Sequence, residues 1–516
     1  MEELYIAALD IGTTSIRCHI VNRQCVTVGI ASNKIQLVYP EPGHVEIEPD
    51  TLWLSIKSVI YNAIANAHLT AGQISCLGIT TQRATFITWD QLTGEPFHNF
   101  ITWKDIRANS LVQMWNKSFT MKTIRTASYI MYLITKNRRY LAASVINFSC
   151  AQVTLRLLWV IQHCVKLKEA ISKNRAMFGT IDSWLIYKLT NGRVHVTDIS
   201  NASATGMYDP FLCSWSDLMN NVFKIPQSIL PKVVDNVAKE FGSTHSKIFG
   251  VEIPIVCSIA DQSASVFASG CYETGNLKMT LGTGSFLDIV TGSIPYASVC
   301  GVYPLIGWKV GKELLYLVEG ATNDTGTIIE WALKVELLTN PMESSELAYK
   351  AGSSDGIYFI PAFSGLGPPI NDLEAASGFI GIKPTTTKEC MVRAVLESIV
   401  FRLVQLLQVV IEEIDITPTV LRVDGGVSQN NFICQLLADM TGLTVERSKN
   451  AEMTVLGVVF LTGLNFGFWK TKNELKAFNE SPDIFKANID NGENYKIIFN
   501  QWNKAVNRFK SWYKIR

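Results

Sequence analysis

One short turn sequence occurs twice, about 270 residues apart, and it constrains the fold more than any other feature. The first copy reads I-G-T-T-S (11–15) and the second reads L-G-T-G-S (281–285). An apolar run precedes each copy (5–9 and 277–281) and another follows it (16–21 and 286–290). This pattern predicts a strand, a tight turn and a returning strand in both places. We therefore predict an internal duplication with a boundary near residues 270–276.

Length and charge fit a large globular protein with no bulk preference for a charged partner. The 516 residues predict two to four domains of ~100–200 residues each. Lysine and arginine number 46 against 45 aspartate and glutamate, which leaves a net charge of +1. This balance selects neither nucleic acid nor an acidic partner. Since 47% of the residues are hydrophobic, we expect extensive buried cores.

Cysteine usage and apolar segments favour a cytoplasmic protein without a membrane span. The 11 cysteines contain no C-x-x-C pair, which argues against a disulfide framework or a zinc finger. The first residues lack the basic and long apolar regions of a secretory signal. The apolar segment 391–410 is interrupted by charges, and 455–469 is shorter than the ~20 residues of a spanning helix. We expect both to be core helices.

Strand-like and helical segments alternate along the chain, which is typical of an α/β fold. We expect strands at 74–80, 254–260 and 420–423, helices at 155–164, 181–189 and 391–410, and a helix beginning near Asn430. Near the C-terminus, Trp502, Val506, Phe509 and Tyr513 are spaced as one helical face. We favour docking of this face on the protein body over a membrane-surface helix, because the basic residues there are few.

The two turns suggest a phosphate-binding site. Glycine and small hydroxyl residues in a tight turn expose backbone N–H groups that bind anions. Asp10 ends the first strand and would suit Mg²⁺, while Arg17 adds a positive charge nearby. Each turn alone is also explained as an ordinary hairpin. Together they favour a polyphosphate clamp, and neither a P-loop nor a dinucleotide-binding G-x-G-x-x-G motif is present.

Asp261 is the candidate general base. It follows the predicted strand 254–260, and ligands of open α/β sheets bind at the carboxyl ends of strands. A carboxylate there can accept a proton from an attacking hydroxyl. A helix N-cap is the equally weighted alternative from the local sequence.

Eight segments in order along nearly the whole chain resemble the FGGY carbohydrate kinases, and within them the glycerol kinases. They are DIGTTSIR (10–17), TQRAT (81–85), FGTIDSWLIYKLTNG (178–192), TDISNAS (197–203), ADQ (260–262), TLGTGSF (280–286), FSGLGPP (363–369) and VDGGVSQNNF (423–432). The resemblance implies two actin-like (ribonuclease H-like) ATPase domains around a central cleft. We assign residues 1–270 and 271–470 to the two domains and 471–516 to a helical tail.

The resemblance also implies a role for individual residues. It places Asp10 at Mg²⁺, Gln82, Arg83 and Gln262 beside the polyol, and Asp261 as the catalytic base. The implied ATP-binding residues are Thr13, Thr14, Ser15, Arg17, Thr283, Gly326, Glu330, Gly426 and Asn430. The implied reaction transfers the γ-phosphoryl group of ATP to a primary hydroxyl of glycerol, giving sn-glycerol 3-phosphate and ADP.

Departures from the family pattern leave the acceptor open. Glycerol kinases have a glutamate where this chain has Ala84, so a carboxylate that accepts a hydrogen bond from the polyol is absent. This change resembles a divergent subgroup of the glycerol kinases. Another small polyol or sugar as acceptor, and a nucleotide-binding regulatory protein, therefore stay as alternatives. Trp103, Asp105 and Arg107 resemble a family motif that borders the substrate pocket, but we favour core packing for them. The sequence does not decide between a monomer and a homo-oligomer.

Overall fold

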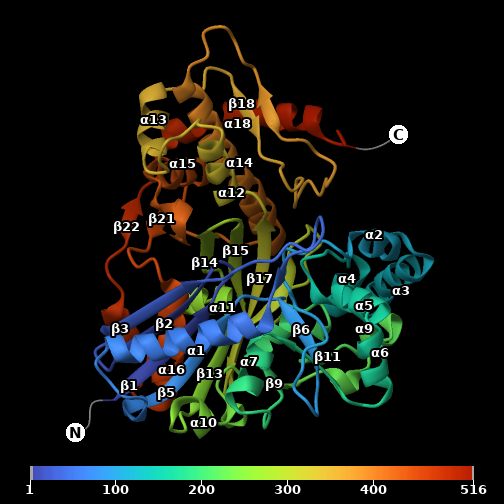
Figure 1. The fold of residues 1–516 in the computed structure, drawn as a ribbon. Helices are drawn as coiled ribbons and strands as arrows, with labels where there is room; N and C mark the ends of the chain where they lie inside the picture. Colours follow the sequence, from blue (N-terminus) through green and yellow to red (C-terminus); the bar gives the residue numbers. More distant parts are fainter. Residues whose placement is uncertain (1–3, 514–516) are drawn as a thin grey trace.

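The computed structural model describes residues 4–513, which form two lobes (Figure 1). The first lobe is built on a five-stranded sheet with the order β13-β5-β1-β2-β3. Its strands are β1 (Tyr5–Ile11), β2 (Ser15–Asn22), β3 (Thr27–Lys34), β5 (Ile74–Thr81) and β13 (Ile255–Ala260). β2 runs antiparallel to β1 and β3, whereas β5 runs parallel to β1 and β13.

The second sheet repeats this topology. Its order is β16-β17-β15-β14-β20-β21-β22, and the five inner strands correspond in place and direction to β3-β2-β1-β5-β13. The strands are β14 (Leu277–Leu281), β15 (Ser285–Gly292), β16 (Tyr303–Val310), β17 (Glu313–Thr322), β20 (Val420–Asp424), β21 (Thr444–Arg447) and β22 (Asp483–Phe485). The predicted α/β class and both predicted hairpins are confirmed, and the shared topology supports the predicted duplication.

Strand β1 shows why the first sheet is covered on both faces. All seven of its residues are buried, and side chains alternate between the two faces of a strand. Leu9 and Ile11 join the cluster of α1 (Pro49–Asn66) and α7 (Ile181–Leu189). Ile6 and Ala8 join the opposite cluster with α11 (Asp261–Ala268) and α16 (Met453–Phe466).

Helix α16 crosses from the second half of the chain to the first lobe. It packs on α11 and on β1, β5 and β13. Gly457 permits this approach, because a Cβ atom there would lie 1.9 Å from the carbonyl oxygen of Ala264. The core of the first lobe is thus completed by residues almost 200 positions further along the chain.

Helix α14 (Lys388–Ile414) is the core helix of the second lobe. In the part of the chain that the structure describes, it alone combines the length and apolar composition of a membrane span, and 78% of its apolar window is buried in the fold. It packs against α13 (Glu343–Ala351), α15 (Asn431–Thr441) and the second sheet. The predictions of core helices at 391–410 and 455–469 are confirmed, except that α16 ends at Phe466 and the buried Phe468 and Trp469 lie beyond it.

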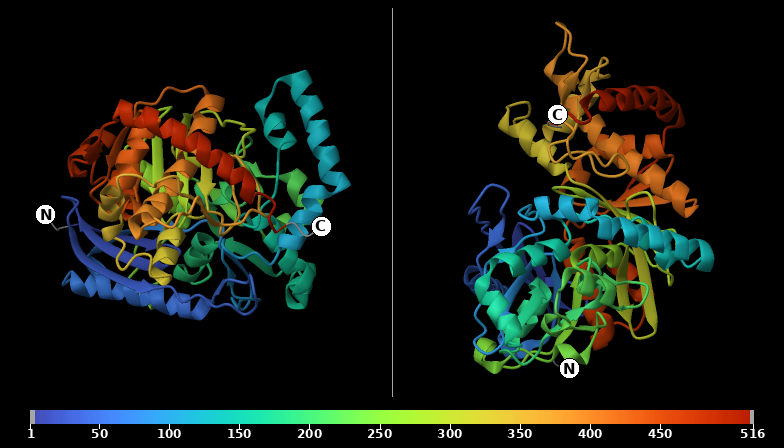
Figure 2. Two further views of the ribbon diagram at one scale, coloured as in Figure 1. Left: turned by 90° about the horizontal axis from the view of Figure 1, so that it is seen from above. Right: turned by 90° about the vertical axis from the view of Figure 1, so that its right-hand side faces the viewer.

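The C-terminal helix α18 (Ile489–Phe509) docks on the second lobe (Figure 2). Trp502 and Val506 are buried, and the indole N–H of Trp502 donates to the carbonyl of Phe359 at 2.8 Å. The predicted docking is therefore confirmed. The inclusion of Tyr513 in the docked face is wrong, because the helix ends at Phe509 and Tyr513 is exposed.

A helical layer extends the first lobe on the right of Figure 1. It consists of α2 (Asn109–Lys117), α3 (Phe119–Thr135), α4 (Arg138–Ser144), α5 (Val153–His163) and α6 (Val165–Ser172). A four-stranded sheet lies beside it, with the order β4 (Glu46–Ile47), β7 (Phe100–Ile101), β6 (Phe86–Asp90) and β8 (Ala176–Thr180). The expected helices at 155–164 and 181–189 are confirmed as α5 and α7.

Short elements complete the fold. In the region between α7 and α11 they are β9 (Val196–Asp198), α8 (Ile199–Ser203), β10 (Tyr208–Asp209), β11 (Ser214–Trp215), α9 (Asp217–Phe223), β12 (Lys232–Val234) and α10 (Ser246–Phe249). The second half adds α12 (Gly326–Lys334), β18 (Tyr358–Ile360), β19 (Gly378–Ile380) and α17 (Lys472–Leu475).

Candidate active site

The first turn, between β1 and β2, is fixed by a hydrogen bond within the turn and by the side chain of Gln82. The N–H of Gly12 donates to the carbonyl of Ser15 at 3.0 Å. The buried amide of Gln82 donates to the carbonyl of Gly12 at 2.8 Å, and its oxygen accepts from the Thr85 hydroxyl. These contacts fix the backbone that carries Thr13 and the exposed Thr14. A turn fixed in this way can present its N–H groups to an anion without reordering.

Asp10 and Arg17 lie side by side at the base of this turn. Asp10 is buried, and its Oδ1 has no hydrogen-bond partner in the described part of the chain. Burial, reinforced by the nearby Asp261, raises the pKa of the Asp10 carboxyl to about 8. Arg17 Nη1 lies 4.0 Å from Asp10 Oδ2 and 2.5 Å from Glu452 Oε2. Arg17 is therefore held between the first sheet and the start of α16.

The second turn, between β14 and β15, is joined to the start of α12. The N–H of Gly326 donates to the carbonyl of Gly282 at 2.9 Å, and the N–H groups of Thr325 and Thr327 donate to the carbonyl of Thr283. A Cβ atom on Gly326 would lie 2.7 Å from the Gly282 oxygen, so only glycine fits. The structure thus brings the predicted residues Thr283 and Gly326 together.

Glu330 lies one turn further along α12 and is exposed. Burial lowers the pKa of Lys104 in the first lobe, and the charge of Glu330 opposes this change.

A third segment lies beside the second turn, because β20 pairs with β14 up to Asp424. Gly426 then begins a 3₁₀ turn and Asn430 caps α15, as the predicted helix start requires. The Asn430 side chain accepts from the N–H of Ile433 at 3.0 Å and donates to the Ser344 hydroxyl at 2.9 Å. Gly326, Gly426 and Asn430 therefore all belong to loops at the same end of the second sheet.

Asp261 directly follows β13 and is the first residue of α11. The N-cap of α11 is Ala260, so the N-cap alternative for Asp261 is wrong. Asp261 Oδ1 accepts from the N–H of Gln262 at 2.8 Å and lies 3.7 Å from Arg83 Nε. Burial raises the pKa of this carboxyl, and the Arg83 charge opposes the increase. The neighbouring Gln262 accepts a hydrogen bond from Thr280 at 2.9 Å.

Arg83 is held by a buried carboxylate that the sequence did not reveal. Its Nη2 lies 2.6 Å from Oε2 of Glu319, a residue of β17 that is fully buried. The hydroxyl of Tyr303 donates to the same carboxylate at 2.7 Å. Arg83 consequently bridges Asp261 of the first lobe and Glu319 of the second.

Glu319 belongs to a polar row that crosses four strands in register. Asp288 pairs with Glu319 on one side and with Lys278 on the other, and Tyr303 is the remaining member. Burial first, and then the charge of Glu319, raises the pKa of Asp288 well above its usual range. Lys278 Nζ lies 3.0 Å from Asp424 Oδ1. The charges of Glu319 and Lys278 in this row act on the pKa of Asp261 in opposite directions, the first raising it and the second lowering it.

Trp103 makes a polar contact in addition to the packing expected for it. Its indole N–H donates to the Thr13 hydroxyl at 3.1 Å, and its ring lies 6.4 Å from that of Phe286. Trp103 thereby connects the first turn with the strand that follows the second turn. By contrast, Arg107 pairs with the buried Asp105 at 2.7 Å, which agrees with the structural role expected for those two residues.

Ala84 forms part of an apolar wall. It is buried in a cluster with Phe86 and Phe148, and its backbone has a left-handed φ of 59°. The fully buried Arg156 donates to the Ala84 carbonyl at 2.7 Å and to four other carbonyls, which holds this loop in place.

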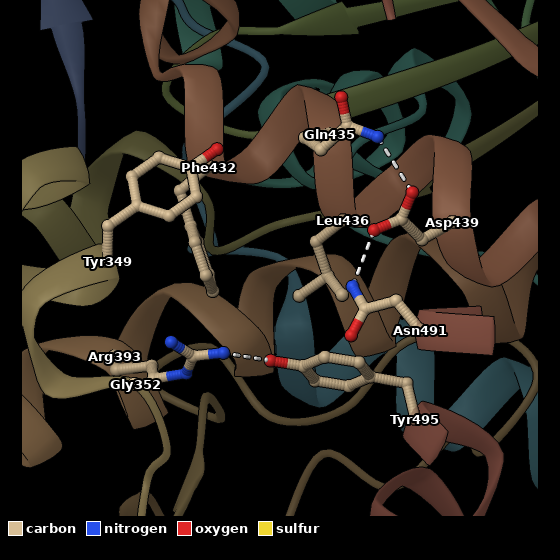
Figure 3. A pocket seen from close by; sticks show the side chains of 9 residues that line it. All are labelled: Tyr349, Gly352, Arg393, Phe432, Gln435, Leu436, Asp439, Asn491 and Tyr495. Atoms are coloured by element: carbon tan, nitrogen blue, oxygen red, sulfur yellow. Dashed lines mark hydrogen bonds between the residues drawn. The ribbon is translucent and has the colours of Figure 1, made fainter. Parts of the chain in front are cut away.

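A separate pocket of about 270 Å³ lies between α13, α14, α15 and α18 (Figure 3). Its polar groups satisfy one another: Arg393 donates to Tyr495, and Asp439 accepts from Gln435 and Asn491. None of the predicted site residues lines it. Among the described residues, no three His, Cys, Asp or Glu side chains are grouped as metal ligands.

Residues 5–268 match the N-terminal domain of the FGGY family of carbohydrate kinases, and residues 277–466 match its C-terminal domain. The chain belongs to the FGGY family. Glycerol kinase 5 of Danio rerio is 46% identical over 99% of this chain and 97% of its own length. Glycerol kinase 2 of Thermotoga maritima is 35% identical over 99% of both chains.

The fold of this FGGY kinase matches solved members. The crystal structure of Plasmodium falciparum glycerol kinase with ADP superimposes with a TM-score of 0.88, at 29% identity and over 98% of both chains. A ligand-bound xylulose kinase from Lactobacillus acidophilus superimposes with a TM-score of 0.81 at 21% identity. The expected two-domain actin-like fold is confirmed, and the protein is a phosphotransferase with an alcohol group as acceptor.

Proposed function

We propose that this FGGY kinase transfers the γ-phosphoryl group of ATP to a primary hydroxyl of glycerol, giving sn-glycerol 3-phosphate and ADP. The position of Asp261 carries the proposal. Its carboxylate stands at the end of β13, partly open to solvent and 3.7 Å from Arg83 Nε, and its charge raises the pKa of Asp10 next to the first turn. A base in this place can reach a hydroxyl that lies between the two turns.

The two turns and their neighbours would bind ATP. We assign the phosphates to the backbone N–H groups and hydroxyls of Thr13, Thr14, Ser15 and Thr283, with Arg17 as the positive charge. We assign the adenosine to the loops that carry Gly326, Glu330, Gly426 and Asn430. Fixed dipoles on both sides would stabilise the charge that develops on the transferred group.

Proton transfer falls to Asp261. The hydroxyl oxygen attacks the γ-phosphorus, the bond from that phosphorus to the β–γ bridging oxygen breaks, and the hydroxyl proton passes to the Asp261 carboxylate. Burial raises the pKa of Asp261, which makes it a stronger proton acceptor than an exposed aspartate. Arg83 and Gln262 would orient the acceptor, while Gln82 supports the first turn.

The residues at Asp10 fit a Mg²⁺ ion. A buried carboxylate with an unpartnered oxygen is costly unless a cation neutralises it, and oxygen ligands suit Mg²⁺. When bound there, Mg²⁺ would offset the charge of the ATP phosphates. Arg17 alone does not provide this neutralisation, because it already pairs with Glu452.

The second candidate is a kinase for another small polyol or sugar, and Ala84 favours it. Ala84 and its apolar neighbours stand where glycerol kinases have a glutamate that accepts a hydrogen bond from the polyol. Losing a hydrogen bond to a charged group typically costs ~1.5–3 kcal/mol of binding free energy. An acceptor with an apolar or larger group on that side would lose less than glycerol does.

The division into residues 1–270, 271–470 and a helical tail at 471–516 is also a proposal. The family matches at 5–268 and 277–466 support the first two segments. The crossing of α16 means that these segments share a core.

The test is an enzyme-coupled ADP-release assay with glycerol and a panel of polyols and sugars, repeated with Asp261→Asn. Asp355→Asn is the matched control, because Asp355 is exposed and its carboxylate pairs with Lys383 away from the predicted site residues. We expect turnover that falls by about 10²–10⁴-fold in Asp261→Asn and persists in the control. ATP binding measured by calorimetry should be retained. Unchanged turnover in Asp261→Asn would overturn the mechanism, and turnover on another acceptor alone would favour the second candidate.

A further inference from the structure

Helix α3 exposes several large apolar residues on the outside of the protein. It projects from the first lobe with α4 (Figure 2). Phe119 is 85% exposed and Ile134 is 72% exposed, while Ile130 and Leu133 are each about half exposed. Phe119, Ile130 and Ile134 are separated by eleven and four residues, so they lie on one side of the helix. Met121 is the one buried residue of α3.

The inward side of α3 already packs against the rest of the helical layer. Met121 joins the apolar cluster of the helical layer, and Ile124 packs against the same cluster. Arg125 donates to the carbonyls of Asn116 and Ile146 and thereby ties α3 to the chain on either side. The exposed apolar side is therefore not the core-facing stripe of a helix that has been left undocked. It is a second apolar face on a helix whose other apolar face packs against the protein body.

The charged residues of α3 and of the segments next to it in the sequence are all basic. Between Ile106 and Lys168 the sequence has ten lysine and arginine residues and no aspartate or glutamate, although the whole chain is nearly neutral. Lys117, Lys122, Lys136 and Arg138 are exposed, and none of them pairs with a carboxylate in the part of the chain that the structure describes. By contrast, Arg139 pairs with Asp209 at 2.8 Å. The apolar face of α3 is thus flanked by uncompensated positive charge.

We propose that α3 docks this kinase on the anionic surface of a lipid bilayer, with Phe119, Ile130, Leu133 and Ile134 inserted at the interface. Helices of this kind combine an apolar face with flanking basic residues and lie in the plane of the membrane. The basic residues contact the anionic headgroups, while the apolar side chains enter the boundary of the acyl chains.

The charges argue against a second copy of the chain as the occupant. An interface between two identical faces would bring Lys122 and Lys136 of both copies together with no carboxylate between them. An acidic protein partner would satisfy the charges, but it would need an apolar groove as well. A bilayer with anionic lipids supplies both a continuous apolar layer and negative charge.

The test is sedimentation of the full-length protein with vesicles of phosphatidylcholine containing 0 or 30 mol% phosphatidylserine. These compositions separate an anionic surface from a neutral one. We expect binding that requires phosphatidylserine and weakens at high salt. Each basic residue near an anionic surface strengthens association about fivefold, so Lys122→Gln/Lys136→Gln should weaken it about 25-fold. Ile130→Ser/Ile134→Ser should weaken it at least tenfold.

Ile489→Ser/Ile497→Ser is the matched control, because these two isoleucines are similarly exposed but lie on α18. It should bind vesicles as the unmodified protein does. All three variants change exposed residues outside the proposed catalytic site, so circular dichroism and kinase turnover in solution should be unchanged.

Three outcomes would overturn the proposal. They are the absence of binding to anionic vesicles, equal binding by Ile130→Ser/Ile134→Ser and the unmodified protein, and self-association without vesicles that this variant abolishes. The last result would identify α3 as an interface between copies. None of these measurements depends on the acceptor of the kinase reaction.

Discussion

The bridge of Arg83 between two carboxylates makes a direct prediction for Glu319→Gln. Arg83 Nη2 lies 2.6 Å from Glu319, and Arg83 Nε lies 3.7 Å from Asp261. The charge of Arg83 lowers the pKa of Asp261, and the charge of Glu319 raises it. Removing the Glu319 charge should therefore lower the pKa of Asp261. The acid limb of the pH profile of kcat should move to lower pH, because the base is then deprotonated at a lower pH.

The magnitude of the effect follows from burial and distance. Two unit charges about 4 Å apart interact by about 4 kcal/mol at an effective dielectric of 20, so the charge balance around Arg83 is a large influence on Asp261. Breaking a buried ion pair by removing one partner costs about 3–5 kcal/mol. We expect a loss near the lower value, about 3 kcal/mol in the free energy of unfolding, because Arg83 retains Asp261.

Tyr303→Phe is the matched control for this experiment. It removes the hydroxyl that donates to Glu319 at 2.7 Å but leaves both carboxylates charged. It should lower the free energy of unfolding by about 1.5 kcal/mol without moving the acid limb of kcat to lower pH. Denaturant unfolding and the kcat profile between pH 5 and about 9 measure both effects. An acid limb that stays in place in Glu319→Gln would refute the proposed electrostatic link.

Three further predictions concern the site. Asp10 has an ordinary pKa of 3.8 that burial raises to about 8, so its contribution to stability is present below about pH 4 and lost as the pH rises to about 8. Asp10→Asn should remove this loss in thermal unfolding, and added Mg²⁺ should stabilise the unmodified protein more at pH 8 than at pH 6 but leave the variant unchanged. Ala84→Glu should lower the KM for glycerol, and an unchanged KM would place Ala84 outside the acceptor site. Trp103→Phe keeps an aromatic ring but removes the donor to Thr13, so KM for ATP should rise several-fold while stability changes by about 1 kcal/mol; an unchanged KM would show that this bond does not position the turn.

Local sequence signals predicted the parts of the fold that depend on local chemistry. Both glycine-containing hairpins, the strand before Asp261 and the helix after Asn430 follow from apolar periodicity and turn or capping residues. Helix α7 (Ile181–Leu189) was predicted to the residue for the same reason. The error at Tyr513 arose because a helical spacing continues in the sequence after the backbone has left the helix.

The contacts that the sequence did not reveal join distant segments. Trp103 bonds Thr13, and Arg83 bonds Glu319, across 90 and more than 200 positions. No local pattern distinguishes Glu319 from any other glutamate in a strand. Its role comes from the fold, which brings the Glu319 carboxylate to Arg83 of the first lobe. The outward direction of the apolar face of α3 does not follow from the sequence either, since periodicity identifies an apolar face without saying which way it points.

The crossing of α16 has a consequence for biosynthesis. The sheet face that carries Ile6 and Ala8 is covered by α16, which leaves the ribosome almost 200 residues after α11. At a synthesis rate of ~5–20 residues per second, this sheet face lacks α16 for about 10–40 s. During that interval the nascent chain exposes a partly formed apolar sheet, the kind of surface that chaperones shield. The two sheets share one topology, yet the first sheet cannot complete its core on the ribosome before most of the second half has been made.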